Sequence, residues 1–160
     1  MQALPIQAKE EQLADSPILI CYDGSTDASR GIEAAAALLK ESRAVVLDVG
    51  PPLTVAESYA SVGGTTPGFE ELNEDAALSR AEKGAGLARD AGLTAEARAE
   101  VAAPSWDGVV QVADEIDAAV IVLGSRGLTG AKELLEGSFS HAVASHAGRP
   151  VLIVPPPASE

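Results

Sequence analysis

The chain has 160 residues, of which 46% are hydrophobic and 3% aromatic, and its formal net charge at pH 7 is −13. This length and hydropathy fit one folded domain with a core of aliphatic side chains, and they argue against an intrinsically disordered chain. The acidic charge repels nucleic acid and anionic membrane surfaces, so we expect neither as a partner.

The start of the sequence mixes Gln, Glu and Lys with a few apolar side chains. We interpret residues 1–15 as a flexible leader before a single domain at 16–157. The single cysteine, Cys21, excludes an internal disulfide and fits a reducing compartment. The sequence shows no signal segment and no apolar run of membrane-spanning length, so we expect a cytoplasmic protein.

The first half of the domain alternates apolar runs with a helical pattern. Apolar runs at 17–22 and 43–49 each predict a buried strand. Between them, candidate N-cap residues at 25–27 precede apolar residues that recur on one helical face as far as Leu39. The stretch 53–68 shows no clean period, which predicts a long connection.

The second half opens with a helical pattern from about 69 to 91, and Gly92 stands in the C-terminal stop position. Two glycines inside this helix, Gly84 and Gly86, are expected to lower its stability but to permit close packing. Residues 95–101 alternate Ala and Val with Glu and Arg, which is typical of a half-exposed edge strand. The remaining elements are a helix from 104, a strand at 118–123, a helix from 138 and a strand at 150–155.

Five predicted strands therefore alternate with four predicted helices. This order is typical of a parallel, doubly wound α/β sheet with helices on both faces. Such sheets bind ligands beyond the carboxyl ends of their strands, where the strand order reverses. With the order 3-2-1-4-5, the reversal lies between the strands that end at Asp23 and Gly124, and we expect a crevice there.

The glycine spacing after the fourth strand is the strongest functional signal. Gly124 is followed by Gly127 and then, after nine intervening residues, by Gly137-Ser138. Glycines let the backbone approach an anion closely, and the free N–H groups at a helix start point toward it. A strand, a glycine loop and a helix start in this order are typical of phosphate binding.

Three parts of the sequence resemble the universal stress protein family, in its ATP-binding subgroup, over residues 16–155. These parts are Ile18–Ser25, Val120–Gly127, and Gly137-Ser138 with Gly148–Val154. The resemblance implies a Rossmann-like fold of the adenine nucleotide alpha hydrolase type. It also implies a stress-response module that binds ATP, or AMP or ADP, with Mg²⁺ or Mn²⁺ bridging the phosphates.

The resemblance also assigns the ligand contacts. It places Asp23 against the adenosine moiety, with Cys21 and Val49 lining the adenine pocket. Gly124 and Gly127 correspond to glycines near the ribose and phosphates, and Gly137, Ser138 and Phe139 match the turn that holds the phosphates. Leu123 and Arg126 complete the predicted nucleotide-binding residues. Glu136 departs from the family, which has apolar residues there, and its carboxylate would either repel a triphosphate or point outward.

Each assigned residue also has a purely structural interpretation. Asp23 could only cap a tight turn, and Gly124 and Gly127 could simply end a strand and turn. Cys21 is more typical of a small core side chain than of a reactive thiol. Arg126 is equally consistent with a phosphate clamp and a solvated loop charge.

The sequence contains no arrangement that predicts a dedicated active site, such as a Ser/His/Asp set or a Walker lysine. His141 and His146 lie five residues apart, off one helical face, which favours surface histidines, and we expect Trp106 to pack or to cover a sheet end. Slow ATP hydrolysis or autophosphorylation stays an alternative by family analogy. An adenylating enzyme is disfavoured because few glycines follow the first strand.

The last strand, Val151–Val154, is apolar, lies at the predicted sheet edge and is flanked by prolines. An exposed edge of this kind invites pairing with another chain. The family resemblance likewise points to a homodimer through this strand. A nucleotide-free dimerisation module is the further alternative, and the intact glycine spacing argues against it.

Overall fold

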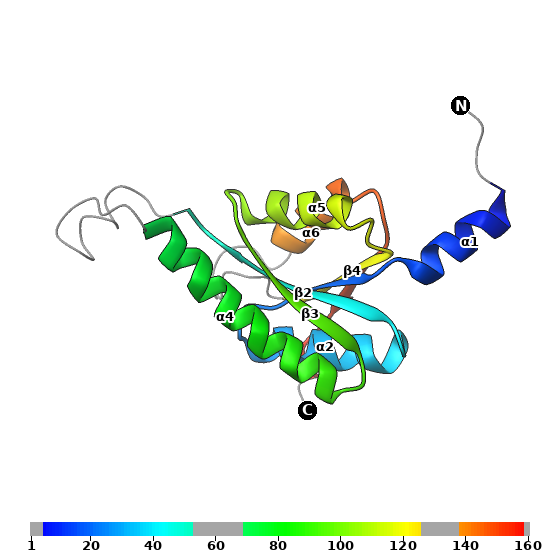
Figure 1. The fold of residues 1–160 in the computed structure, drawn as a ribbon, viewed down its shortest axis with the longest axis horizontal. Helices are drawn as coiled ribbons and strands as arrows, with labels where there is room; N and C mark the ends of the chain where they lie inside the picture. The colour runs from blue at the N-terminus through cyan, green and yellow to red at the C-terminus, as the bar shows by residue number, and fades with distance from the viewer. Residues whose placement is uncertain (1–4, 53–68, 126–137, 159–160) are drawn as a thin grey trace.

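The computed structural model describes residues 5–52, 69–125 and 138–158, and Figure 1 shows their arrangement. At the centre lies a five-stranded sheet in the order β3-β2-β1-β4-β5, and each neighbouring pair is parallel. The strands are β1 Ile18–Cys21, β2 Arg43–Gly50, β3 Thr94–Val101, β4 Val120–Gly124 and β5 Val151–Val154. The predicted fold class and strand order are confirmed.

Helices cover both faces of this sheet. One face carries α2 (Thr26–Leu38) and α4 (Phe69–Asp90), and the other carries α5 (Ser105–Glu115) and α6 (Ser138–His146). Parallel neighbours need such crossover connections, because a strand must return to the same end of the sheet before it can pair again. None of the helices in the described ranges combines the length and hydropathy that a membrane crossing needs.

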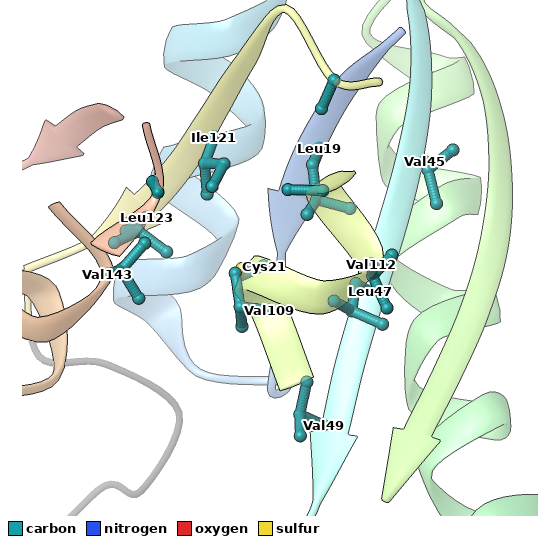
Figure 2. Packing of buried hydrophobic residues seen from close by; sticks show 13 residues of the cluster. Leu19, Cys21, Val45, Leu47, Val49, Val109, Val112, Ile121, Leu123 and Val143 are labelled. Atoms are coloured by element: carbon teal, nitrogen blue, oxygen red, sulfur yellow. The ribbon is translucent and has the colours of Figure 1, made fainter. Parts of the chain in front are cut away.

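Each face of the sheet has its own apolar core. Because side chains alternate along a strand, Leu19 and Cys21 enter the core under α5 and α6, whereas Ile18 and Ile20 enter the core under α2 and α4. Figure 2 shows the first of these cores, in which Val143 of α6 meets side chains from the central strands. Burial on both faces explains why the β1 segment is continuously apolar.

The edge strand β3 differs from the central strands, as its alternating sequence predicts. Glu96, Arg98 and Glu100 follow one another on the α5 side, and none of them is fully buried. Arg98 Nη2 lies 3.7 Å from Glu100 Oε2 and also pairs with Glu115 of α5. Charged side chains on an edge strand oppose pairing with another chain, so this edge is protected.

Residues Ile6–Asp15 form helix α1, where the sequence analysis expects a flexible leader. The helix extends away from the sheet in Figure 1, and Ile6 is 77% exposed. Near its end, Gln12 Nε2 donates to Asp117 Oδ2 at 3.1 Å. No apolar face predicts this helix, because its main apolar side chains, Ile6 and Leu13, are both exposed.

Candidate functional site

The carboxyl ends of β1 and β4 meet at the centre of the sheet, where the strand order reverses. A small pocket of about 10 Å³ lies there, between the ends of these strands, the start of α2 and the start of α6. Its lining residues are Cys21, Asp23, Ser25, Asp27, Ala28, Leu123, Gly124 and Phe139. The structure thus brings Cys21, Asp23, Leu123, Gly124 and Phe139 together, all of which the sequence analysis assigns to one site.

The turn after β1 is built around Asp23. Gly24 follows with φ +87°, a conformation that glycine adopts without strain. The Ser25 backbone N–H donates to Asp23 Oδ1 at 2.9 Å. Asp23 therefore holds the turn, as its structural interpretation predicts, and it also lines the pocket.

Helix α2 begins directly beyond this turn. Ser25 is its N-cap, and the Ser25 hydroxyl accepts a hydrogen bond from the Ala28 N–H at 3.1 Å. The pocket wall therefore includes the first turn of α2, which the sequence analysis identified only as a capping segment. The N-cap pattern at Ser25 could have predicted that this turn lines the pocket. A helix that starts just after a central strand starts at the carboxyl end of the sheet, where ligands bind.

Gly124 is needed for the contact between β4 and α2. A Cβ at this position would lie 2.8 Å from the Asp27 carbonyl oxygen and 2.9 Å from its carbonyl carbon. Backbone atoms cannot swing aside as the end of a side chain can, so only glycine allows this approach. The first glycine of the spacing thus has a packing function in addition to its place in the pocket.

Cys21 is buried beside the pocket, with 3% of its surface exposed. Burial raises the pKa of the Cys21 thiol far above its ordinary value, and the nearby carboxylates of Asp48 and Asp23 raise it further. A thiol of this kind stays protonated and unreactive at neutral pH. Cys21 is therefore an apolar wall of the pocket.

The sequence analysis did not identify Asp48 as part of this edge of the sheet. Asp48 lies on β2, is 3% exposed, and its Oδ2 is 2.5 Å from Arg80 Nε on α4. Burial raises the pKa of the Asp48 carboxyl, although the bond from Arg80 opposes this effect. The sequence could have indicated this ion pair, because Asp48 is an acidic residue within a buried apolar run of β2 and a buried charge needs a partner.

The other predicted ligand contacts lie either outside this pocket or outside the described residues. Val49 is buried in the same core as Cys21, beside Gly108 of α5, and does not line the pocket described above. Ser138 is the first residue of α6. The Ser138 side chain and all of Arg126, Gly127 and Gly137 lie outside the described residues.

Comparison with known proteins identifies the family. The model of the universal stress protein family matches residues 16–155. Universal stress protein YxiE of Bacillus subtilis (strain 168) is 31% identical over 144 residues, which cover 86% of this chain and 97% of that protein.

Two solved structures show the same fold. The protein MJ0577 superposes with a TM-score of 0.71 at 23% identity, over 91% of this chain and 99% of that chain. A universal stress protein in complex with cAMP superposes with a TM-score of 0.61 at 26% identity, over 88% of this chain and 97% of that chain.

Proposed function

Because this chain belongs to the universal stress protein family, we propose that it binds an adenine nucleotide in the pocket between β1 and β4. The observation that carries the proposal is the convergence of Asp23, Gly124 and Phe139, from three separate segments, at the strand-order reversal. The related structure in complex with cAMP supports an adenine nucleotide as the ligand. The position at the strand-order reversal agrees with the general rule for open α/β sheets.

The lining residues suggest how the ligand lies. Cys21, Leu123 and Phe139 are apolar and suit the faces of an adenine ring. We assign Asp23 to the adenosine moiety, with Val49 as support behind Cys21. The backbone at Gly124 and the start of α6 at Ser138 then lie on the phosphate side, where helix N–H groups favour an anion.

We propose ATP as the ligand, with its phosphates held by Arg126, Gly127, Gly137 and Ser138. Among the described residues, no three His, Cys, Asp or Glu side chains are grouped so that they could hold a metal ion. A Mg²⁺ or Mn²⁺ ion would enter with the nucleotide and neutralise part of its phosphate charge. This matters in a protein of net charge −13, whose field opposes an anionic ligand.

Calorimetric titration tests the proposal with ATP, ADP, AMP and cAMP, each with and without Mg²⁺. The Gly127→Glu variant places a carboxylate in the glycine spacing and should weaken binding at least about tenfold, which is about 1.4 kcal/mol. Ala144→Glu adds the same charge at an exposed position of α6 and should bind as the wild type does. No heat from the wild type with any nucleotide, or equal affinities in both variants, would overturn the proposal.

We further propose that the protein is a cytoplasmic homodimer that pairs through β5 and acts as a regulatory module without dedicated catalysis. β5 is an outer strand of the sheet, and its Ile153 is 41% exposed. Ile153→Lys should convert a dimer into a monomer in light scattering at micromolar concentration. The control Leu87→Lys changes a side chain of similar exposure, 43%, on α4 and should leave the dimer intact. A monomeric wild type contradicts the dimer.

A further inference from the structure

Helix α1 lies outside the part of the chain that matches the family model, which covers residues 16–155. It points away from the sheet in Figure 1, and its two large apolar side chains are exposed, Ile6 by 77% and Leu13 by 55%. These residues are seven positions apart, so they share one face of the helix. Neither belongs to the two cores of the sheet, which leave this apolar stripe uncovered.

Helix α1 has little local stabilisation of its own. Pro5 at its N-cap makes no side-chain capping bond, its first turn carries no acidic residue, and its last turn carries no basic residue. A helix of ten residues is marginal in water unless its apolar face packs against something. The stripe therefore needs a partner surface.

A groove of about 430 Å³ lies at the base of α1, at the amino-terminal edge of the sheet. Leu13 and Asp15 of α1 contribute to its lining, as do Leu39 and Lys40 after α2 and Arg43 at the start of β2. Arg43 Nη2 donates to the Asp15 carbonyl oxygen and so fixes the end of α1 in the lining. Because its own last turn lines the groove, α1 cannot fold back to fill it.

The stripe is complementary in charge to a second copy of itself. Lys9 and Glu10 occupy the two positions between Ile6 and Leu13 on the same face, at the spacing i, i+3, i+4, i+7. In an antiparallel pair of helices in which Ile6 of each copy meets Leu13 of the other, position 9 of each copy faces position 10 of the other. Opposite charges then meet twice between two apolar contacts.

We propose that α1 is a self-association element, through which two copies of the chain pair antiparallel about a two-fold axis between Lys9 and Glu10. The contact is isologous, so each copy supplies both the stripe and the groove. Because Leu13 lines the groove, the pairing brings Ile6 of each copy to the groove of the other. The net charge of −13 disfavours an anionic membrane surface as the alternative occupant. Helices this short cover less area than a standard interface, so we expect a weak association, independent of the nucleotide and of β5.

Sedimentation at increasing protein concentration tests the association in the Ile153→Lys background, which removes the contact proposed for β5. This variant should still dimerise, and adding Ile6→Ser should weaken the dimer at least about tenfold, because each dimer buries two copies of the side chain. Glu10→Lys places like charges opposite each other and should also weaken the dimer. Glu11→Lys makes the same charge change on the opposite face of α1 and should leave the dimer as it is.

Disulfide trapping locates the contact. The single native cysteine, Cys21, is buried, so Glu10→Cys introduces one accessible thiol. Mild oxidation should link this variant into a covalent dimer, whereas Glu11→Cys should stay monomeric. The proposal is overturned by equal trapping of both variants, or by an Ile153→Lys protein that stays monomeric at every concentration. It is also overturned if Ile6→Ser lowers the Tm of that monomer, since the chain itself would then cover the stripe, or if the monomer binds phosphatidylcholine vesicles through Ile6.

Discussion

Two glycines that the sequence cannot distinguish have opposite surroundings in α4. A Cβ on Gly84 would lie 2.6 Å from Tyr22 Cδ1, 2.7 Å from Tyr22 Cγ and 2.8 Å from Val46 Cγ1. A Cβ on Gly86, two residues further along, would meet no atom within 4 Å. Gly84 therefore allows the buried Tyr22 ring to pack on the helix backbone, whereas Gly86 has no such function.

Alanine substitution at each position gives results of opposite sign. Replacing Gly by Ala inside a helix raises the free energy of unfolding by about 1 kcal/mol, and Gly86→Ala should show this gain in full. Gly84→Ala receives the same gain but overpacks the core, which costs about 1–3 kcal/mol, so its net effect is a loss of about 0–2 kcal/mol. Because the helix preference cancels, the difference between the variants measures the overpacking alone.

Urea unfolding followed by far-ultraviolet circular dichroism, at one protein concentration, measures this difference. A gain of 1 kcal/mol corresponds to about 2–4 °C in Tm for a chain of this size, which is easily measured. If both variants are stabilised equally, the close contact with Tyr22 does not exist and the reasoning is refuted. Since Tyr22 precedes Asp23, Gly84→Ala should also weaken nucleotide binding, whereas Gly86→Ala should not.

Three further predictions follow from the buried polar and glycine positions. Burial raises the pKa of the Asp48 carboxyl, so the folded state keeps this proton to higher pH than the unfolded chain does. The wild type should therefore gain stability over Asp48→Asn as the pH falls from 7 toward about 4. Urea titrations that show the reverse would contradict this prediction. Arg149 donates to three backbone carbonyls and to the exposed Asp114. Arg149→Ala should therefore lose about 2–4 kcal/mol in chemical unfolding and Asp114→Asn under about 1 kcal/mol, and similar losses in both would show that the carbonyl bonds contribute little. Gly124→Ala places its methyl group against backbone and should lose about 1–3 kcal/mol, whereas Gly31→Ala meets atoms no closer than 3.8 Å and should be neutral or stabilising, as thermal melts would show.

The alternation of apolar runs and helical patterns was sufficient to predict the fold. Strands β1 and β4 are buried on both faces, so their sequences are continuously apolar and easy to recognise. Edge strand β3 carries charges on one side only, which gave its alternating pattern. The strand ends then placed Asp23 and Gly124 at one crevice, and the structure brings both into the same pocket.

Other features depend on contacts that no local pattern encodes. The Asp48–Arg80 pair joins residues 32 positions apart, and its existence depends on how α4 lies across β2. The stack of Trp106 on His146 likewise requires the relative placement of α5 and α6. Cys21, in contrast, was correctly interpreted as a core side chain, because burial is the common state of a lone cysteine.

The packing of Gly124 changes what the glycine spacing can be taken to mean. A nucleotide is not needed to explain this glycine, because the Asp27 backbone already excludes any larger residue there. The argument for phosphate binding therefore depends on Gly127 and Gly137, for which we propose a ligand function. Measurements of stability and of nucleotide affinity should distinguish Gly124 from Gly127. Gly124→Ala should lower both the stability and the affinity, whereas Gly127→Glu should lower the affinity and leave the stability unchanged. A Gly127 variant that unfolds as readily as Gly124→Ala would assign the whole spacing to the fold.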